Sequence, residues 1–186
     1  MKSTAPRAPR VAAHKTRARG LARINIASNA DASAALSDCC GSREWVRRML
    51  ARRPFESPEE LYNVAGQVWN GLRNEHWLEA FRHHPQIGSN NAEQKQSRTA
   101  KAWSASEQSA AGGASTDAKE QLAAANRVYE RKFGFIFIVC AAGKATEEIL
   151  ALLNQRLRNS SSVEIRVAAE EQRKITRVRL EKLLTK

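Results

Sequence analysis

The stretch Ser57-Pro58-Glu59-Glu60-Leu61-Tyr62-Asn63-Val64-Ala65-Gly66-Gln67-Val68-Trp69-Asn70-Gly71-Leu72 indicates most directly which fold this chain adopts. Its beginning is typical of a helix start. Ser57 can accept a hydrogen bond from a free backbone amide, Pro58 suits the first helical position, and Glu60 can bond back to the cap. The apolar residues that follow recur at helical spacing and form one stripe. The stretch therefore predicts an amphipathic helix with one side buried in a core.

Similar helical patterns lie on both sides of this stretch. Short helices are expected around residues 34–36 and 45–50, and longer ones over 74–83, 116–133, 146–157 and from 162 onward. The apolar run 135–142 has a β-like composition but no partner strand, so we expect an extended wall or the start of a buried helix there. The sequence predicts an all-α, single-domain bundle of seven to nine helices with no sheet.

The net charge of +12 is concentrated at the start of the 186-residue chain. Residues 1–30 contain seven Lys and Arg and no Asp or Glu, so +7 of the +12 lies there. This region lacks apolar periodicity, and we expect a disordered basic extension ahead of a folded domain of residues 31–186. Its composition also resembles that of an organellar transit peptide. One alternative function is therefore a small basic helical module that binds nucleic acid through residues 1–30.

Several classes of chemistry have no support in the sequence. The histidines lack H-x-x-x-H spacing, and the three cysteines, Cys39, Cys40 and Cys140, form neither a C-x-x-C pair nor a disulfide framework. No apolar run reaches the roughly 20 residues that span a bilayer, and no phosphate-binding glycine loop is present. We therefore expect no metal, no cofactor and no membrane segment, in a cytoplasmic protein with reduced thiols.

Three segments nevertheless supply parts for a small polar pocket. His84-Pro85 combines an imidazole, which titrates near neutrality, with a rigid turn at a helix exit. Ser104-Ala105-Ser106-Glu107-Gln108 adds a carboxylate and an amide, and the run 132–139 adds an apolar backbone wall. These parts point to an enzyme that acts on a small molecule.

Residue spacing leaves three ambiguities in this interpretation. His83 competes with His84 for a catalytic role. The pattern Ser104-x-x-Glu107 is also a capping box, which needs no ligand to explain it, although a cap and a binding site can coincide. In the last helix, Arg177 and Arg179 belong by default to a solvated face, but either one turned inward could clamp an anion.

Taken in order along residues 30–184, the motifs resemble the family of 2-oxo-4-hydroxy-4-carboxy-5-ureidoimidazoline (OHCU) decarboxylases, which act between urate and allantoin. The matching pieces are Arg53-Pro54-Phe55, His84-Pro85, Trp103-Ser104-x-x-Glu107-Gln108, residues 122–126 with Tyr129, Lys132-Phe133-Gly134-Phe135-x-Phe137, Glu148-Ile149-Leu150 and Arg179-Leu180. Each piece alone is weak, whereas the ordered set is specific.

The resemblance implies an all-α homodimer without metal or cofactor that converts OHCU to (S)-allantoin and carbon dioxide. It implies that His84 is the catalytic proton donor, because the family's histidine directly precedes the proline, and that Glu107 orients the imidazole or the substrate. The implied substrate contacts are Pro85, Ser104, Glu107, Gln108, the backbone of Phe137, Ile138, Val139, Cys140 and Ala141, the side chain of Arg179, and backbone amides of Ala105 and Ser106.

Two segments depart from the family pattern. Gln86 follows Pro85 where many relatives have Asp or Arg, so the loop contacts with substrate are open. Cys39-Cys40-Gly41-Ser42 replaces a larger aromatic segment, which leaves the packing near the first helices open. A third interpretation is that this chain is a catalytically inactive relative, which uses the pocket only to bind its ligand.

Overall fold

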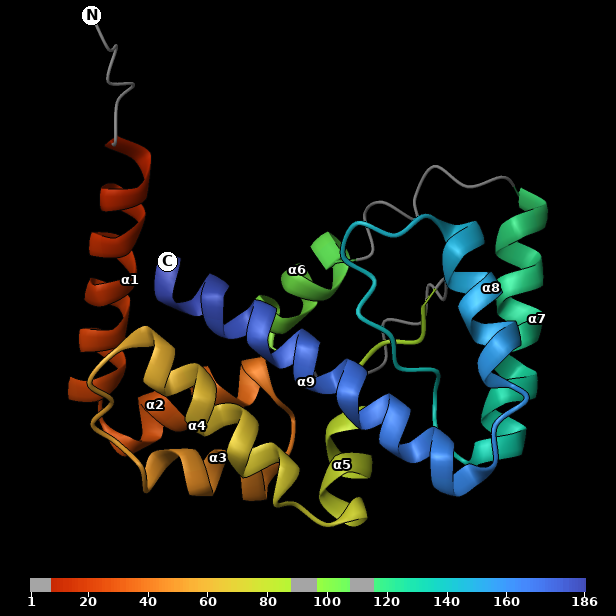
Figure 1. The fold of residues 1–186 in the computed structure, drawn as a ribbon, viewed down its shortest axis with the longest axis horizontal. Coiled ribbons are helices and arrows are strands. Elements are labelled where there is room, and N and C mark those ends of the chain that lie inside the picture. Colours follow the sequence, from red (N-terminus) through yellow and green to blue (C-terminus); the bar gives the residue numbers. More distant parts are fainter. Residues whose placement is uncertain (1–7, 88–96, 108–115) are drawn as a thin grey trace, which may run out of the picture.

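The computed structural model describes residues 8–87, 97–107 and 116–186. In these residues all regular structure is helical, which confirms the predicted all-α class. The helices are α1 (Ala8–Ile26), α2 (Asn29–Cys39), α3 (Arg43–Leu50), α4 (Pro58–Asn70), α5 (Asn74–Phe81), α6 (Arg98–Glu107), α7 (Thr116–Phe133), α8 (Thr146–Arg156) and α9 (Ser161–Thr185). Figure 1 shows the long α9 crossing the molecule, with α1 to α5 gathered along one half and α7 and α8 at the other end.

Helix α4 forms for the reasons that its sequence suggests. The Ser57 hydroxyl accepts a hydrogen bond from the Glu60 amide at 3.0 Å, although the Glu60 carboxylate bonds to the Glu56 amide rather than to the cap. The apolar stripe of α4 is buried. Two indole N–H groups tie this helix to its neighbours, since Trp45 donates to the Ala65 carbonyl on α4 and Trp69 donates to the Ala169 carbonyl on α9. Helix α4 thus joins α3 to the central helix.

The prediction of a disordered extension over residues 1–30 is wrong for Ala8–Ile26, which form α1; residues 1–7 lie outside the described residues. Helix α1 packs on α9 and buries Leu21 and Ile24. Asn25 exchanges two hydrogen bonds with the backbone of Phe55. The buried part of α1 is short, and the helix that covers it, α9, lies far away in the sequence. Apolar periodicity within α1 could therefore not reveal this packing.

We expect Gly20→Ala to destabilise the protein, although alanine normally favours a helix interior by about 1 kcal/mol. A Cβ at position 20 would lie 2.1 Å from the Leu184 carbonyl oxygen on α9. The two helices would have to separate, at a cost of about 1–3 kcal/mol. The matched control is Gly66→Ala on α4, where the nearest atom to the new Cβ is 3.9 Å away. Thermal unfolding should show Tm falling for the first variant and rising for the second; a rise in both would contradict the α1–α9 packing.

Candidate active site

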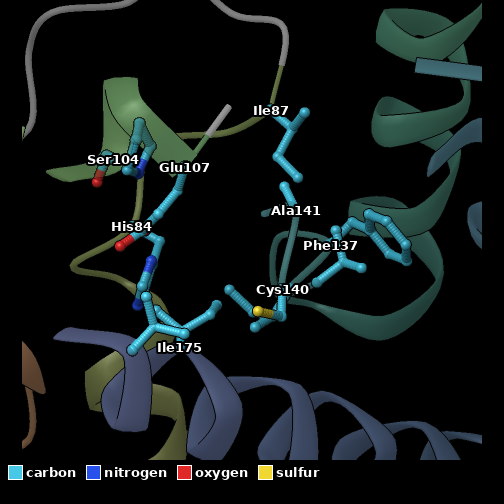
Figure 2. A pocket seen from close by; sticks show the side chains of 12 residues that line it. His84, Ile87, Ser104, Glu107, Phe137, Cys140, Ala141 and Ile175 are labelled. Atoms are coloured by element: carbon cyan, nitrogen blue, oxygen red, sulfur yellow. The ribbon is translucent and has the colours of Figure 1, made fainter. Parts of the chain in front are cut away.

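A small cleft brings together the segment after α5, the end of α6, the middle of α9 and residues 135–141, which we call the wall. Figure 2 shows His84 and Glu107 on one side of this cleft, Phe137, Cys140 and Ala141 on the other, and Ile175 of α9 between the two sides. The cleft encloses about 30 Å³, which is room for only one or two water molecules. The lining residues are His84, Pro85, Ile87, Ser104, Glu107, Phe137, Ile138, Val139, Cys140, Ala141, Ile175 and Val178.

His84 occupies the predicted helix exit. Helix α5 ends at Phe81, and the His84 amide donates to the Phe81 carbonyl at 3.1 Å. Burial lowers the pKa of His84 to about 3, and the nearby positive charge of Arg179 acts in the same direction. The ring is therefore neutral at physiological pH and can accept a proton from a bound molecule.

The competing residue His83 faces away from the cleft. Its side chain is exposed, and its Nδ1 lies 3.0 Å from the Glu79 carbonyl oxygen. It also packs so closely on Gly41 that a Cβ there would lie 2.3 Å from the imidazole ring. Residue spacing could not decide between His83 and His84 as the catalytic histidine. Of the two, His84 lines the cleft.

The capping-box interpretation of Ser104 and Glu107 is wrong. Helix α6 already begins at Arg98, where the Ser97 hydroxyl accepts from the Ala100 amide, and Glu107 is the last of its residues that the structure describes. Ser104 and Glu107 lie three positions apart on one face of a helix, a spacing that the capping pattern shares. The same pair therefore lines the cleft from a helix that starts several residues earlier, and it does not cap a helix start.

Arg179 of α9 is the arginine that turns inward, and it holds the end of α6. Its Nη2 donates to the Ser104 hydroxyl at 2.9 Å and to Glu107 Oε2 at 3.0 Å, while its Nη1 donates to the Asp38 carbonyl at 3.3 Å. Lys182 places a second cation 3.4 Å from Glu107. Arg177 is exposed and lies over the Tyr62 ring. Arg179 stands behind Ser104 and Glu107 and does not itself line the cleft.

The wall is neither helix nor strand, and charged side chains hold its backbone from the side of α8 and α9. The Ile138 carbonyl accepts from Arg156 Nη1 at 2.8 Å, and the Cys140 amide donates to Glu171 Oε2 at 2.8 Å. The Cys140 carbonyl accepts from Lys144 Nζ at 2.9 Å. A carbonyl and an amide in this segment need such partners because no neighbouring strand supplies them. The alternative that the run starts a buried helix is therefore wrong.

Most residues predicted for the site meet in the cleft. His84, Pro85, Ser104, Glu107 and the five wall residues 137–141 all line it. Ala105 and Ser106 are exposed and do not line it, whereas Gln108 lies outside the described residues. Ile87, Ile175 and Val178 were not predicted as site residues, because apolar side chains at helical spacing indicate only a core-facing surface.

Within the described ranges, no group of three or more His, Cys, Asp and Glu side chains is arranged to hold a metal ion. None of the described helices combines the length and apolarity needed to cross a membrane.

Comparisons with known proteins give a consistent result. The model of the OHCU decarboxylase family matches residues 25–181. The chain is 42% identical over 148 residues to the uric acid degradation bifunctional protein TTL of Arabidopsis thaliana, which covers 79% of this chain but only 45% of that protein. A 2-oxo-4-hydroxy-4-carboxy-5-ureidoimidazoline decarboxylase of Haloferax volcanii is 29% identical, covering 73% of this chain and 79% of its own.

The chain is also similar to solved structures. One of them is a crystal structure of OHCU decarboxylase in the presence of (S)-allantoin, with 37% identity and a TM-score of 0.71. The match covers 82% of this chain and 99% of that chain. The chain thus spans under half the length of the bifunctional Arabidopsis protein and nearly the whole of the solved decarboxylase.

Proposed function

The chain belongs to the OHCU decarboxylase family, and we propose that it converts OHCU to (S)-allantoin and carbon dioxide. The observation that carries this proposal is the meeting, in one cleft, of His84, Glu107 and the wall residues 137–141. A neutral imidazole opposite a row of backbone groups suits a substrate ring that must be held flat while one ring carbon loses a carboxyl group and its neighbour gains a proton.

The substrate's own functional groups make an external electron acceptor unnecessary. When the bond from C4 to the carboxylate breaks, its electron pair forms a C4–C5 double bond and the C5 imine pair moves to the ring nitrogen. The product then needs a proton on C5 and one on that nitrogen, while the 4-hydroxyl loses its proton to become a carbonyl. The reaction therefore consumes one proton overall, as conversion of a carboxylate anion to a neutral product and carbon dioxide requires.

His84 is the group that moves the proton to C5. In the protein without substrate the ring is neutral, because burial lowers the pKa of His84. The negative charge of the bound substrate carboxylate opposes this shift, so His84 gains its proton with the substrate in place. The 4-hydroxyl of the substrate is a suitable source, because it has to lose its proton. His84 then delivers that proton to C5 on the face toward its side chain, which sets the handedness of the product. Donation by His84 is thus the second half of a shuttle.

Glu107 and the wall position the substrate for this step. The Glu107 carboxylate faces the cleft with Arg179 and Lys182 behind it, and it can accept hydrogen bonds from ureido N–H groups. The Cys140 amide already donates a hydrogen bond to Glu171, whereas no described residue accepts one from the amides of Val139 and Ala141. These two amides are the donors we assign to the substrate carbonyl groups. Gln108, the homodimer and the cytoplasmic location predicted from the sequence remain part of this proposal.

The deciding experiment measures the optical activity of the product. OHCU made in situ by urate oxidase and hydroxyisourate hydrolase decays spontaneously, so the purified protein should accelerate its loss and yield optically active allantoin. Racemic allantoin formed at the spontaneous rate would refute the proposal and would favour a relative that only binds the substrate.

A further inference from the structure

The wall separates the cleft from a second, larger hollow of about 500 Å³, and both Val139 and Cys140 line the two spaces. The rest of the hollow is lined by α8, α9 and the segments that flank α8. Close packing normally keeps a buried segment in place, but a hollow of this size leaves the wall without packed neighbours on that side. Polar contacts across the hollow must therefore fix its position.

Three backbone groups of the wall are bonded to charged side chains that line this hollow. The Cys140 amide donates to Glu171 Oε2 at 2.8 Å, and the Cys140 carbonyl accepts from Lys144 Nζ at 2.9 Å. The Ile138 carbonyl accepts from Arg156 Nη1 at 2.8 Å. Opposite charges thus hold the amide and the carbonyl of Cys140 from the same side.

The direction of the Cys140 groups determines where the neighbouring groups point. Figure 1 shows the wall as an open trace between α7 and α8. In extended backbone the amide and carbonyl of one residue point to one side, and those of the next residue point to the other. With Cys140 turned to the hollow, the amides of Val139 and Ala141 are turned toward the cleft, which both residues line. No described residue accepts a hydrogen bond from either amide.

We propose that Glu171 is a positioning residue for the reaction. By holding the Cys140 amide, with Lys144 on the carbonyl, it keeps the amides of Val139 and Ala141 directed at the substrate. The inference rests on the proposed function for the identity of the bound molecule. A carboxylate can only accept hydrogen bonds and an ammonium group can only donate them, so Glu171 selects an N–H and Lys144 a carbonyl. Their charges therefore specify the orientation of the wall as well as its position.

Helix α9 connects this contact to the opposite side of the cleft. Glu171 Oε1 pairs with Lys174 Nζ at 2.6 Å, which leaves Oε2 for the wall. Eight residues further along α9, Arg179 bonds to Ser104 and Glu107 on α6. Eight residues rise about 12 Å along a helix. One rigid helix thus sets the spacing between the wall and the carboxylate that faces it.

The kinetic test compares substitutions of Glu171. Glu171→Leu removes the acceptor and should lower kcat/KM for OHCU by about 10- to 100-fold, since small misplacements of binding groups are costly. Its Tm should change by no more than about 4 °C, because water in the hollow can replace the carboxylate at the Cys140 amide. Glu171→Gln keeps an accepting oxygen at the same reach and should retain most of the activity. Lys174→Met is the matched control, which leaves the contact with Cys140 and should have near-wild-type kcat/KM.

Amide hydrogen exchange measures the direction of the wall groups. Without ligand, the Cys140 amide should exchange more slowly than those of Val139 and Ala141, and Glu171→Leu should abolish this difference. Saturating (S)-allantoin, the product of the proposed reaction, should slow exchange at Val139 and Ala141 in the wild type but not in Glu171→Leu. Slowing at Cys140 instead would overturn the inference.

Lys144→Met provides a second route if Glu171→Leu does not fold, because it removes the donor to the Cys140 carbonyl and should also lower kcat/KM. Unchanged kcat/KM in both variants would contradict the positioning role. If the wild type fails to turn over OHCU while ligand-free exchange at Cys140 responds to Glu171→Leu as described, the proposed function is wrong and the hold of Glu171 on the wall stands.

Discussion

Replacing His84 by Asn should lower kcat for OHCU decarboxylation by about 10²- to 10⁴-fold, the range expected when a general acid–base group is lost. Asparagine is a smaller, uncharged polar side chain, so the surrounding helices should keep their packing. It cannot accept a proton from the 4-hydroxyl and return it to C5, and the remaining reaction should lose its stereochemical preference. Helicity measured by circular dichroism should be unchanged.

His83→Asn is the matched control, because it changes the adjacent histidine, which is exposed and faces away from the cleft. We expect near-wild-type kcat and optically active allantoin from this variant. Loss of activity in His83→Asn together with normal activity in His84→Asn would reverse the assignment that the structure supports. The rate of OHCU disappearance and the circular dichroism of the product measure both effects.

Glu164→Ala should reduce the free energy of unfolding by about 3–5 kcal/mol, because it leaves a buried cation without its partner. The Glu164 side chain is fully buried and accepts from Arg156 Nε at 2.7 Å, from Asn159 Nδ2 at 2.7 Å and from the Tyr129 hydroxyl. Arg156 in turn donates to the Ile138 carbonyl in the wall. The substitution removes the carboxylate that orients this arginine, so it should also loosen one side of the cleft.

Glu170→Ala is the control on the same helix. Glu170 forms a comparable pair with Arg173, but the two side chains are 46% and 42% exposed, so its loss should cost at most about 1 kcal/mol. Urea unfolding followed by circular dichroism gives both values. Equal effects of the two substitutions would show that the Arg156–Glu164 pair is not the buried contact described here.

Local sequence patterns predicted α2 to α5 and α7 to α9, whose signals act over three or four residues, but they predicted neither α1 nor α6. Pro58 follows a capping serine, and Gly134 adopts φ 77° to end α7, as expected of a left-handed terminator. The helix expected over residues 74–83 is slightly too long, since α5 ends at Phe81. Helix ends are less well defined than helix interiors, so errors of one or two residues are inherent in local patterns.

The sequence by itself determined the helical class, the exit turn at His84-Pro85 and the ordered motifs that the family match confirms. Tertiary structure decided which side chains face one another. Arg179 bonds to Ser104, 75 residues away, and α1 packs on the far end of α9. Helix periodicity states which residues share a face, but the partner of that face depends on how distant elements pack. For that reason the inward turn of Arg179 could be seen only in the folded chain.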